Sequence, residues 1–554
     1  MILTIRKRIT VYQYTLFQEV KDLKESMNKQ EELNENKKHN KSGEIRSTPQ
    51  APLITSYLAV PLRIKTELMS VRECERLRRI TERDTRIIRD YLRIIYHNEE
   101  TKVLRNGQLQ RLINKDFSVN KSVLDMLTLT TFMKGRNKLR TSVPHDMKKR
   151  FPRCSVNEFI ECRDKAIWIY KSWKKLQRFK TYINKPELKK KIPRPMYLNL
   201  TGGCTVRIRS TPNNSKTSLD LEIRDSLDSK RSGKRYHDSL LLPLAYSPYH
   251  KKKLEQGKTK MVELFYDSKK KQWYAGLIQQ VSVPCYLSSN PTAVLGVDLG
   301  IKKTAVAVLL SSNGRVTMDE LCFIVNKERQ AKIFRIEKRI QSIQKELDLR
   351  IRYCQPHNQL RAKLSQLRRQ LHTVRKEELG YAVNQLVDFI IQLKKHYNLF
   401  VSIGYPKNIR NKHQRGSGRK SLRRKIHKWC YRLFITKLKH KLELQGFESY
   451  RVVAVDERYT SKQCPRCLSR KTTRSGQGRF VCNQCNYELN ADLNGARNIA
   501  KRLIKYVLEP IGDFKKNNVL RDKLSGDFHT LELYECFKPL SQWLKYSIGD
   551  ISFL

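Results

Sequence analysis

Two pairs of cysteines in the C-terminal part of the sequence have the spacing of a metal site. Cys464 with Cys467 and Cys482 with Cys485 each form a C-x-x-C step, and fourteen residues separate the two steps. The two-residue spacer lets both thiolates of a step turn onto one ion, so two steps complete a tetrahedral four-sulfur zinc site. Two unrelated buried cysteine pairs are the alternative, which the polar, arginine-rich intervening segment disfavours. Because a four-sulfur site is closed, we expect one structural Zn²⁺ there and chemistry at other residues.

Three carboxylates are candidates for that chemistry. Glu457 precedes the first cysteine step, Asp492 follows the second, and Asp298 lies inside the apolar run AVLGVDLGIKKTAVAVLL. A carboxylate in such a run costs free energy unless it binds a cation or accepts from an N–H group. A turn-forming or helix-capping aspartate is the alternative for Asp298. Asp492 opens a helix that we predict over residues 491–504.

The order of the predicted elements places these acids in one RNase H-like sheet. A strand, a glycine turn and a returning strand begin at residue 292, and a helical hairpin over residues 327–397 follows them. The strands NLFVSIGYP and SYRVVAV come next. In such a sheet, acids distant in sequence hold two divalent ions ~4 Å apart, which activate water and stabilise the leaving oxygen of a phosphodiester. Since magnesium prefers hard oxygen ligands, we predict two Mg²⁺ ions bound by Asp298, Glu457 and Asp492.

The first half of the chain is predicted to hold a helical bundle inserted into a small β-barrel. Residues 56–68 alternate as a strand, the segment from residue 71 to about 189 has helical periodicity, and strands recur over residues 193–283. The strand near residue 58 is expected to pair with the later strands. The whole chain is therefore predicted to be a multidomain α+β protein.

The predicted divisions follow these changes of pattern. They are a polar basic extension (1–52), the first strand of a β-barrel (53–70), a helical domain (71–190), the remaining barrel (191–291), an RNase H-like part with the helical hairpin (292–459), a zinc ribbon (460–488), a second RNase H-like part (489–510) and a C-terminal tail (511–554).

The charge of the chain indicates a nucleic-acid partner. Lysines and arginines number 113 against 53 acidic residues, a formal net charge of +60 that a polyanion would neutralise. Residues 407–428 carry ten of these cations and no acid. We predict that this basic loop contacts nucleic acid through Arg410, Lys412, Arg415, Arg419, Lys420, Arg423 and Arg424.

The remaining composition favours an intracellular, soluble protein. Nine of the thirteen cysteines lie outside the two steps without a pairing pattern, which is typical of a reducing compartment. The N-terminal residues mix charges with apolar residues, unlike a signal peptide, and no apolar run reaches membrane-spanning length. The location is expected to be the cytoplasm or nucleoid in a prokaryote and the nucleus in a eukaryote.

Three motifs resemble a known family. The segments GVDLGIKKTAVAV, GYPKNIR and ERYTSKQCPRC with FVCNQCNYELNADLNGARNIA are similar to the RuvC-like nuclease region of TnpB, the transposon-encoded RNA-guided nuclease. The Fanzor proteins and the compact type V CRISPR effectors share these parts. The resemblance is specific over residues 292–505, and upstream only the order and type of the elements match.

The resemblance implies a transposon-associated enzyme that carries a guide RNA and cuts double-stranded target DNA. In such enzymes base pairing supplies the sequence specificity, and the protein holds the heteroduplex through its shape and backbone charge. No membrane partner is expected, and a monomer is favoured.

One position departs from the family pattern. Family members commonly carry the second acid at the end of the middle strand, where this sequence has Gly404. Some TnpB and many Fanzor proteins instead have a glutamate before Thr-Ser-Lys, the place that Glu457 occupies here. Neighbouring Asp456 is a weaker candidate, because side chains alternate between the faces of a strand.

Two other functions stay open at this point. If Glu457 is only a surface acid, the chain is a catalytically inactive RNA-guided DNA-binding or regulatory protein. A transposase-type strand transferase uses similar acids, but a zinc ribbon between the last two carboxylates is typical of TnpB.

Overall fold

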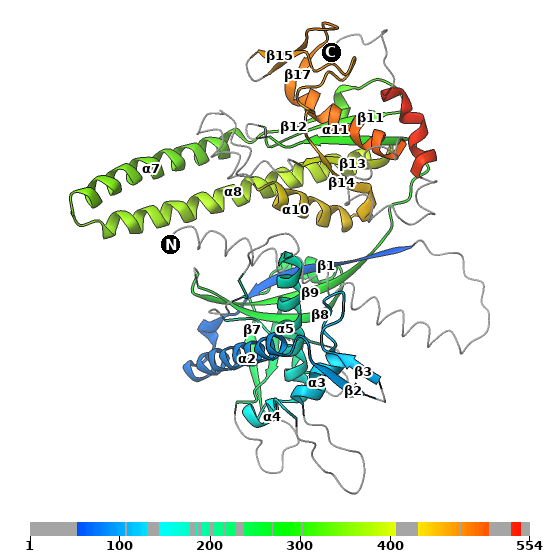
Figure 1. Ribbon diagram of the computed structural model, residues 1–554. Coiled ribbons are helices and arrows are strands. Elements are labelled where there is room, and N and C mark those ends of the chain that lie inside the picture. Colours follow the sequence, from blue (N-terminus) through cyan, green and yellow to red (C-terminus); the bar gives the residue numbers. More distant parts are fainter. Residues whose placement is uncertain are drawn as a thin grey trace, which may run out of the picture. The chain divides into compact units, whose positions relative to one another are not determined.

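The structure, a computed structural model, confirms a multidomain α+β protein. It describes residues 52–105, 108–129, 143–177, 184–186, 191–198, 204–213, 216–227, 238–268, 270–300, 303–405, 430–475, 478–508 and 533–544. These residues belong to two compact units, Thr55–Ser282 and Val283–Leu554, the second of which also includes Ala51–Ile54 (Figure 1). No helix of the described part is long and apolar enough to cross a lipid bilayer.

The first unit contains two antiparallel sheets that share a core. One sheet has the order β1-β9-β8-β4 and the other has the order β5-β6-β7. An isolated bridge between Ile64 and Leu244 joins them, and Leu62, Leu221 and Leu277 are buried in their common core. The strands are β1 (Leu53–Arg63), β4 (Pro195–Tyr197), β5 (Val206–Asn213), β6 (Lys216–Arg224), β7 (Ser239–Pro243), β8 (Lys258–Asp267) and β9 (Gln272–Pro284).

The helices of this unit lie between β1 and β4 in the chain, as the insertion predicted from the sequence requires. They are η1 (Thr66–Leu68), α2 (Val71–His97), α3 (Lys121–Thr128), α4 (Met147–Arg150) and α5 (Val156–Gln177), with α6 (Pro248–Leu254) later in the chain. Ser70 and Glu73 form a capping box at the start of α2. The pairing of β1 with β9 is also as predicted, whereas closure of the strands into a barrel stays a prediction.

Two elements of this unit differ from the sequence-based prediction. A β-hairpin of β2 (Lys102–Arg105) and β3 (Gln108–Arg111) interrupts the segment expected to be helical throughout. Its signal is the Asn106-Gly107 dipeptide, which favours a tight hairpin turn. Strand β7 was not predicted, because its SLLLP sequence is a short apolar run without visible alternation. Pairing with β6 buries alternate residues of that run.

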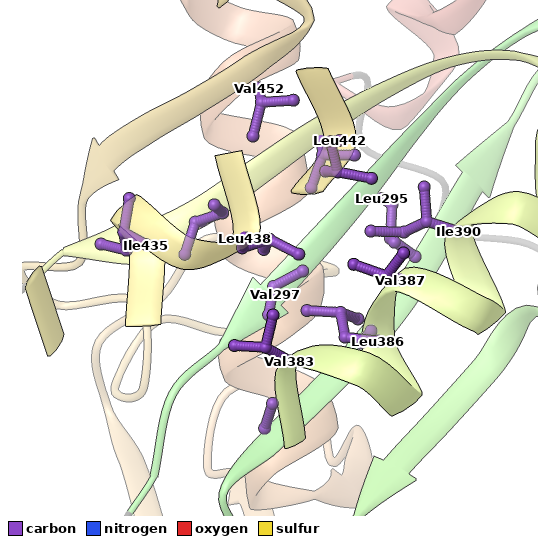
Figure 2. Close-up of a cluster of buried hydrophobic side chains, with 14 of the residues drawn as sticks. Leu295, Val297, Val383, Leu386, Val387, Ile390, Ile435, Leu438, Leu442 and Val452 are labelled. Carbon is purple, nitrogen blue, oxygen red and sulfur yellow. The ribbon is translucent and has the colours of Figure 1, made fainter. Parts of the chain in front are cut away.

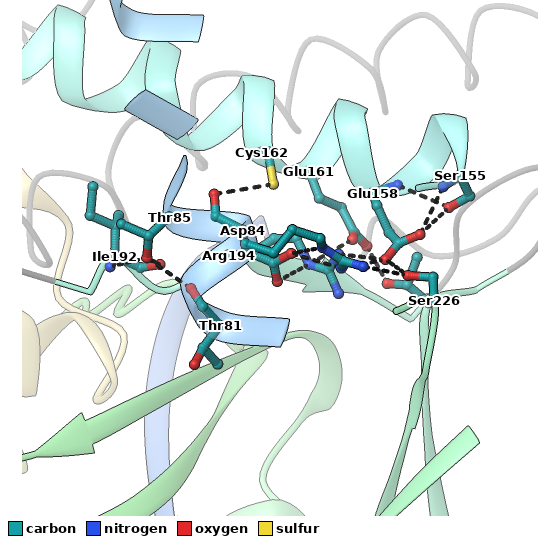
Figure 3. A network of polar contacts seen from close by, with 12 residues as sticks. Thr81, Asp84, Thr85, Ser155, Glu158, Glu161, Cys162, Ile192, Arg194 and Ser226 are labelled. Atoms are coloured by element: carbon teal, nitrogen blue, oxygen red, sulfur yellow. Dashed lines mark hydrogen bonds and ion pairs between the residues drawn. The ribbon is translucent and has the colours of Figure 1, made fainter. Parts of the chain in front are cut away.

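Buried charges join α2, α5 and the segment before β4 (Figure 3). The guanidinium of Arg194 lies 3.3 Å from Asp84, 3.2 Å from Glu158 and 3.4 Å from Glu161. All four side chains are buried, and burial raises the pKa of Glu161 to about 8 although Arg194 opposes the shift. Arg83 also pairs with Asp84 and Glu158, whereas Arg194 is the cation that contacts all three carboxylates.

The second unit contains a mixed five-stranded sheet of order β12-β11-β10-β13-β14. Strands β10, β11 and β12 are antiparallel neighbours, while β13 and β14 run parallel to β10. The strands are β10 (Thr292–Asp298), β11 (Ala305–Ser311), β12 (Leu321–Ile324), β13 (Asn398–Tyr405) and β14 (Val452–Asp456). Strand, returning strand, helical hairpin, two further strands and the helix opened by Asp492 occur in the order expected from the sequence.

Helices cover both faces of this sheet. On one face, α8 and α10 pack on Leu295 and Val297 of β10 and on Val452 of β14 (Figure 2). On the other face lie α11 and the segment of residues 533–543, including Phe537 and Trp543. The helices are η2 (Met318–Glu320), α7 (Lys327–Arg352), α8 (Asn358–Leu393), α10 (Tyr431–Glu443), η3 (Ser449–Arg451), α11 (Ala491–Leu508) and η5 (Lys538–Trp543).

Helix α11 approaches β10 very closely. A Cβ atom at Gly296 would lie 2.1 Å from the carbonyl oxygen of Ala496 and 2.7 Å from the backbone nitrogen of Ala500. Only glycine permits this approach without displacing the helix. The start of α11 is thereby held against the carboxyl end of β10.

We predict that Arg194→Ala destabilises the first unit by ~3–5 kcal/mol, because three buried carboxylates lose their shared cation. Urea unfolding of the full chain, followed by limited proteolysis of residues 55–282, measures the effect. Arg209→Ala is the matched control, since the exposed Arg209 pairs with Glu222 on the surface of the same unit. Its effect is expected within ~0.5 kcal/mol. Equal stability of the two variants would contradict the role assigned to Arg194.

Candidate catalytic and metal sites

The first two candidate acids lie at the carboxyl ends of the two parallel strands that flank β13. Asp298 is the last residue of β10, whose register with β13 pairs Val297 with Ile403 and so places Asp298 beside Gly404. Strand β14 continues the sheet by pairing Gly404 with Val455, and Glu457 follows that strand directly. Acids separated by more than 150 residues in sequence thus meet at one edge of the sheet.

Side-chain alternation places Glu457 on the face covered by α11. Val453 and Val455 of β14 pack with α11, whereas Val452 contributes to the core on the opposite face. Glu457 continues the first set. Asp456 continues the second, and its carboxylate accepts a hydrogen bond from the backbone N–H of Arg458. The structure therefore brings Glu457, and not Asp456, onto the face of Asp298.

The carboxylate of Glu457 lies next to position 404. A Cβ atom built on Gly404 would lie 3.2 Å from Oε2 of Glu457 and 2.6 Å from Cδ1 of Ile499. Glycine at this position leaves room for both side chains. Gly495 of α11 is similar, because a Cβ there would lie 2.5 Å from Oδ2 of Asp298. These two glycines let both carboxylates lie against α11.

Asp492 enters from the first turn of α11. Asn490 caps the helix by accepting hydrogen bonds from the backbone N–H groups of Asp492 (3.0 Å) and Leu493 (3.4 Å). The Asp492 carboxylate forms an ion pair with Lys303 at 3.1 Å and lies 4.0 Å from the guanidinium of Arg474. Lys303 and Arg474 were not singled out from the sequence, because isolated cations in so basic a chain carry no distinctive signal.

The three acids influence one another electrostatically. Burial, and then the charge of Asp492, raises the pKa of Asp298 to about 6. Burial, followed by the charges of Asp298 and Asp456, raises the pKa of Glu457 to about 8. Carboxylates that repel one another in a buried site are stabilised by a proton or by a cation. This donor set of hard oxygens fits Mg²⁺.

The acids form a looser group than the cysteines do. Within the described ranges, the only cluster of three or more potential ligands whose donor atoms all lie within 4.8 Å of one another is Cys464, Cys467, Cys482 and Cys485. The third candidate acid, Asp492, forms an ion pair with Lys303. A cation that binds all three acids would therefore replace Lys303 as the partner of the Asp492 carboxylate.

The cysteines belong to a small three-stranded sheet between Glu457 and Asp492. Its strands are β15 (Thr472–Ser475), β16 (Arg479–Cys482) and β17 (Glu488–Asn490), in the order β15-β16-β17. The two steps form equivalent turns, in which the residue after each second cysteine, Leu468 (φ 58°) or Asn486 (φ 52°), is left-handed. Its N–H donates to the carbonyl of the first cysteine of that step.

The sulfur geometry fits one tetrahedral zinc ion. The Sγ atoms of Cys464 and Cys485 lie 3.7 Å apart, and those of Cys467 and Cys482 lie 3.4 Å apart. Zn–S bonds of ~2.3 Å in a tetrahedron separate neighbouring sulfurs by about 3.8 Å. The cluster predicted from the C-x-x-C spacing is thus present, and its four thiols are placed to bind Zn²⁺.

The seven predicted nucleic-acid-binding residues of the basic loop, Arg410 to Arg424, lie outside the described residues. The C-terminal segment was assigned no role from the sequence. In the structure Trp543 donates from Nε1 to the carbonyl of Ser311 at 2.6 Å, and its ring faces the guanidinium of Arg497 at 5.3 Å. This segment covers α11 on the side away from the acids.

Comparison with known proteins shows similarity to CRISPR-associated endodeoxyribonucleases. Residues 431–499 match the family model described as "Cas12f1-like, TNB domain". The chain is 40% identical over 76 residues to CRISPR-associated endodeoxyribonuclease Cas12f1 of Sulfoacidibacillus thermotolerans. The aligned segment covers 14% of this chain and 17% of that protein. It is 27% identical over 222 residues to Cas12f2 of Micrarchaeota archaeon (strain CG1_02_47_40), with 38% and 37% covered.

Similarity to solved structures is weaker. A Cas12f1–sgRNA–target DNA complex matches with a TM-score of 0.43 and 18% identity, covering 62% of this chain and 70% of that chain. The matched part of the chain spans about a sixth of the length of Cas12f1 and well under half of the length of Cas12f2. Similarity to compact type V effectors, expected from the motifs, is thus confirmed, and the narrower assignment to TnpB or Fanzor stays a prediction.

We predict that Cys482→Ser lowers the melting temperature of the full chain, because loss of one thiolate weakens a metal site whose binding is coupled to folding. Differential scanning fluorimetry and zinc content by mass spectrometry measure the effect. Cys354→Ser replaces an exposed cysteine of the same unit and should leave both values unchanged. A zinc content of zero in the wild-type protein purified without chelator would refute the assignment.

We also predict that stabilisation by Mg²⁺ increases with pH. The pKa of Glu457 is raised from 4.5 to about 8, so its protonated form favours the folded state. Its contribution to stability is fully present below the unfolded value and is lost as the pH rises through about 8. A bound cation replaces that proton, and its apparent affinity should rise up to ~10-fold per pH unit below this pKa.

The measurement is the Mg²⁺-dependent shift in melting temperature at pH 6 and pH 8. In the wild-type protein Mg²⁺ should raise the melting temperature more at pH 8 than at pH 6. In Glu457→Gln this difference between the two pH values should be lost. Asp456→Asn is the matched control on the opposite face. It removes only the smallest of the three contributions to the raised pKa of Glu457, so it should keep the larger shift at pH 8. A shift independent of pH in the wild-type protein would contradict cation binding by Glu457.

Proposed function

We propose that the protein is an RNA-guided DNA endonuclease. The observation that carries this proposal is the meeting of three acids on one face of a sheet, with a four-cysteine ribbon in the chain between Glu457 and Asp492. The strand order and the meeting of the acids support the RNase H-like, RuvC-type nuclease predicted from the sequence. Two relatives of the chain are named as CRISPR-associated endodeoxyribonucleases.

Asp298, Glu457 and Asp492 would hold two Mg²⁺ ions, which supply an activated water and stabilise the leaving oxygen. The protein's own contribution is positioning. Close packing against Gly495 of α11 leaves Asp298 only partly exposed, while Lys303 and Arg474 keep positive charge beside Asp492. The four cysteines would hold one structural Zn²⁺. The zinc chemistry is separate from the reaction, because a four-sulfur site has no open position.

The partners proposed are a guide RNA and a double-stranded DNA target. A formal charge of +60 suits a chain that encloses more than one nucleic-acid strand. Base pairing with the guide would select the target, while the protein binds the heteroduplex through its backbone. A transposon-associated role as a TnpB or Fanzor protein is part of the proposal, and it rests on the motifs of residues 292–505.

Gly404 is the observation that favours an inactive RNA-guided DNA-binding protein, because it removes the acid that family members commonly carry there. The position of Glu457 supports the active alternative. Its Oε2 atom lies 3.2 Å from the position of a Cβ atom at residue 404, and burial together with the charge of Asp298 raises the pKa of Glu457 to about 8.

The test is cleavage by the full chain purified with the RNA that it retains. A plasmid matching that RNA should be cut with Mg²⁺, and Asp298→Ala or Glu457→Ala should lower the rate by ~10³-fold or more, since ~4 kcal/mol of transition-state stabilisation corresponds to that factor. Guide binding should be unchanged in both variants.

Asp456→Asn is again the matched control, and it should cut at close to the wild-type rate. Wild-type protein that binds the plasmid tightly without cutting would support the inactive alternative. Normal cutting by Glu457→Ala would show that the second acid lies elsewhere.

A further inference from the structure

A hollow lies in the second unit next to Glu457. It has a volume of about 400 Å³ and is lined by Arg458, Tyr459, Ser461 and Lys462. The lining thus combines two cations, an aromatic ring and a hydroxyl group, and it contains no carboxylate. No role has so far been assigned to these residues.

Tyr459 has an unusual conformation in this hollow. Its φ angle is 65°, in the left-handed region that residues with a side chain rarely adopt. Burial of the side chain does not compensate for the cost of this backbone conformation, because Tyr459 is 48% exposed. Strained residues of this kind cluster at functional sites, where the surrounding structure holds them in place. The conformation of Tyr459 therefore indicates a function on the surface.

Helix α11 holds the backbone that bears this tyrosine. Nδ2 of Asn498 donates to the carbonyl oxygens of Thr460 at 2.8 Å and Gln463 at 2.7 Å. Nη2 of Arg502 donates to the carbonyl oxygen of Arg458 at 3.0 Å. The loop is thus fixed by its backbone, and the side chains that line the hollow remain free to bind a ligand.

The ring of Tyr459 already takes part in one stacking contact. The guanidinium of Arg470 lies 4.4 Å from the ring centroid. A nucleobase on the exposed part of the ring would extend this stack. Aromatic rings with neighbouring cations are the usual binding surface for single-stranded nucleic acid, in which bases stack and phosphates meet lysine or arginine.

We propose that Tyr459 stacks a base of the DNA strand to be cut, while Arg458 and Lys462 bind the adjacent phosphates. The loop that lines the hollow follows Glu457 directly in the chain, which links a nucleotide bound there to the second candidate acid. Tyr459 is thus a positioning residue that aligns the strand with the acids. The identity of the strand rests on the proposed function, whereas the binding of a single strand rests on the hollow alone.

The test uses a single-stranded DNA oligonucleotide that contains 2-aminopurine, whose fluorescence falls when the base stacks. It is bound to the full chain carrying Asp298→Ala, which prevents cutting, with excess duplex DNA to occupy other basic surfaces. Tyr459→Ala should weaken binding about 5- to 100-fold and abolish the quenching. Tyr459→Phe should retain both, because the ring is kept.

The matched control is Tyr353→Ala, which removes an exposed tyrosine after α7. It should leave affinity and quenching unchanged. Lys462→Ala should reduce the slope of log affinity against log salt by about 0.7, the contribution of one phosphate contact on a single strand. Lys338→Ala, an exposed lysine on α7, should leave that slope unchanged.

The outcomes separate this inference from the proposed function. Quenching that persists in Tyr459→Ala, with unchanged melting temperature, overturns the inference even if the wild-type protein cuts DNA. Absence of cutting by wild type overturns the nuclease function, while Tyr459-dependent quenching would still establish the single-strand site. Tyr459-dependent quenching by an RNA oligonucleotide of the same sequence, and not by DNA, overturns the assignment to the DNA strand.

Discussion

The contact between α11 and the end of β10 is the constraint on which the second unit depends. It requires Gly296, because a Cβ there would meet the backbone of Ala496 and Ala500, and Gly495, because a Cβ there would meet the carboxylate of Asp298. Through this contact one helix performs three tasks. It brings Asp492 to the sheet edge, it covers Asp298 and Glu457, and it holds the loop before the first cysteine step through Asn498.

The electrostatics of the acid site follow from that packing. Burial raises the pKa of both Asp298 and Glu457; the charge of Asp492 adds to the effect at Asp298, and that of Asp298 adds to it at Glu457. The site is then stabilised by positive charge or by protons. Lys303 supplies positive charge at Asp492 alone. A stable fold that concentrates like charges in this way is typical of functional sites, since packing elsewhere in the unit compensates for the local cost.

The four-cysteine ribbon links two parts of that site in the chain. It begins shortly after Glu457, and its last strand, β17, ends at Asn490, which caps α11 beside Asp492. A metal that orders the ribbon therefore also limits how far the second and third acids can separate.

The sequence by itself determined the features that depend on spacing within a segment: the two C-x-x-C steps, the hairpin of α7 and α8, the strand order and the candidate acids. Only the tertiary structure decided the rest, because it depends on register and on contacts between distant residues. Alternation along β14 decides on which face Glu457 lies. The pairing of Gly404 with Val455 places the Glu457 carboxylate next to residue 404. Likewise, the Lys303–Asp492 pair and the Tyr459 hollow arise only when the sheet edge, the ribbon and α11 are packed together.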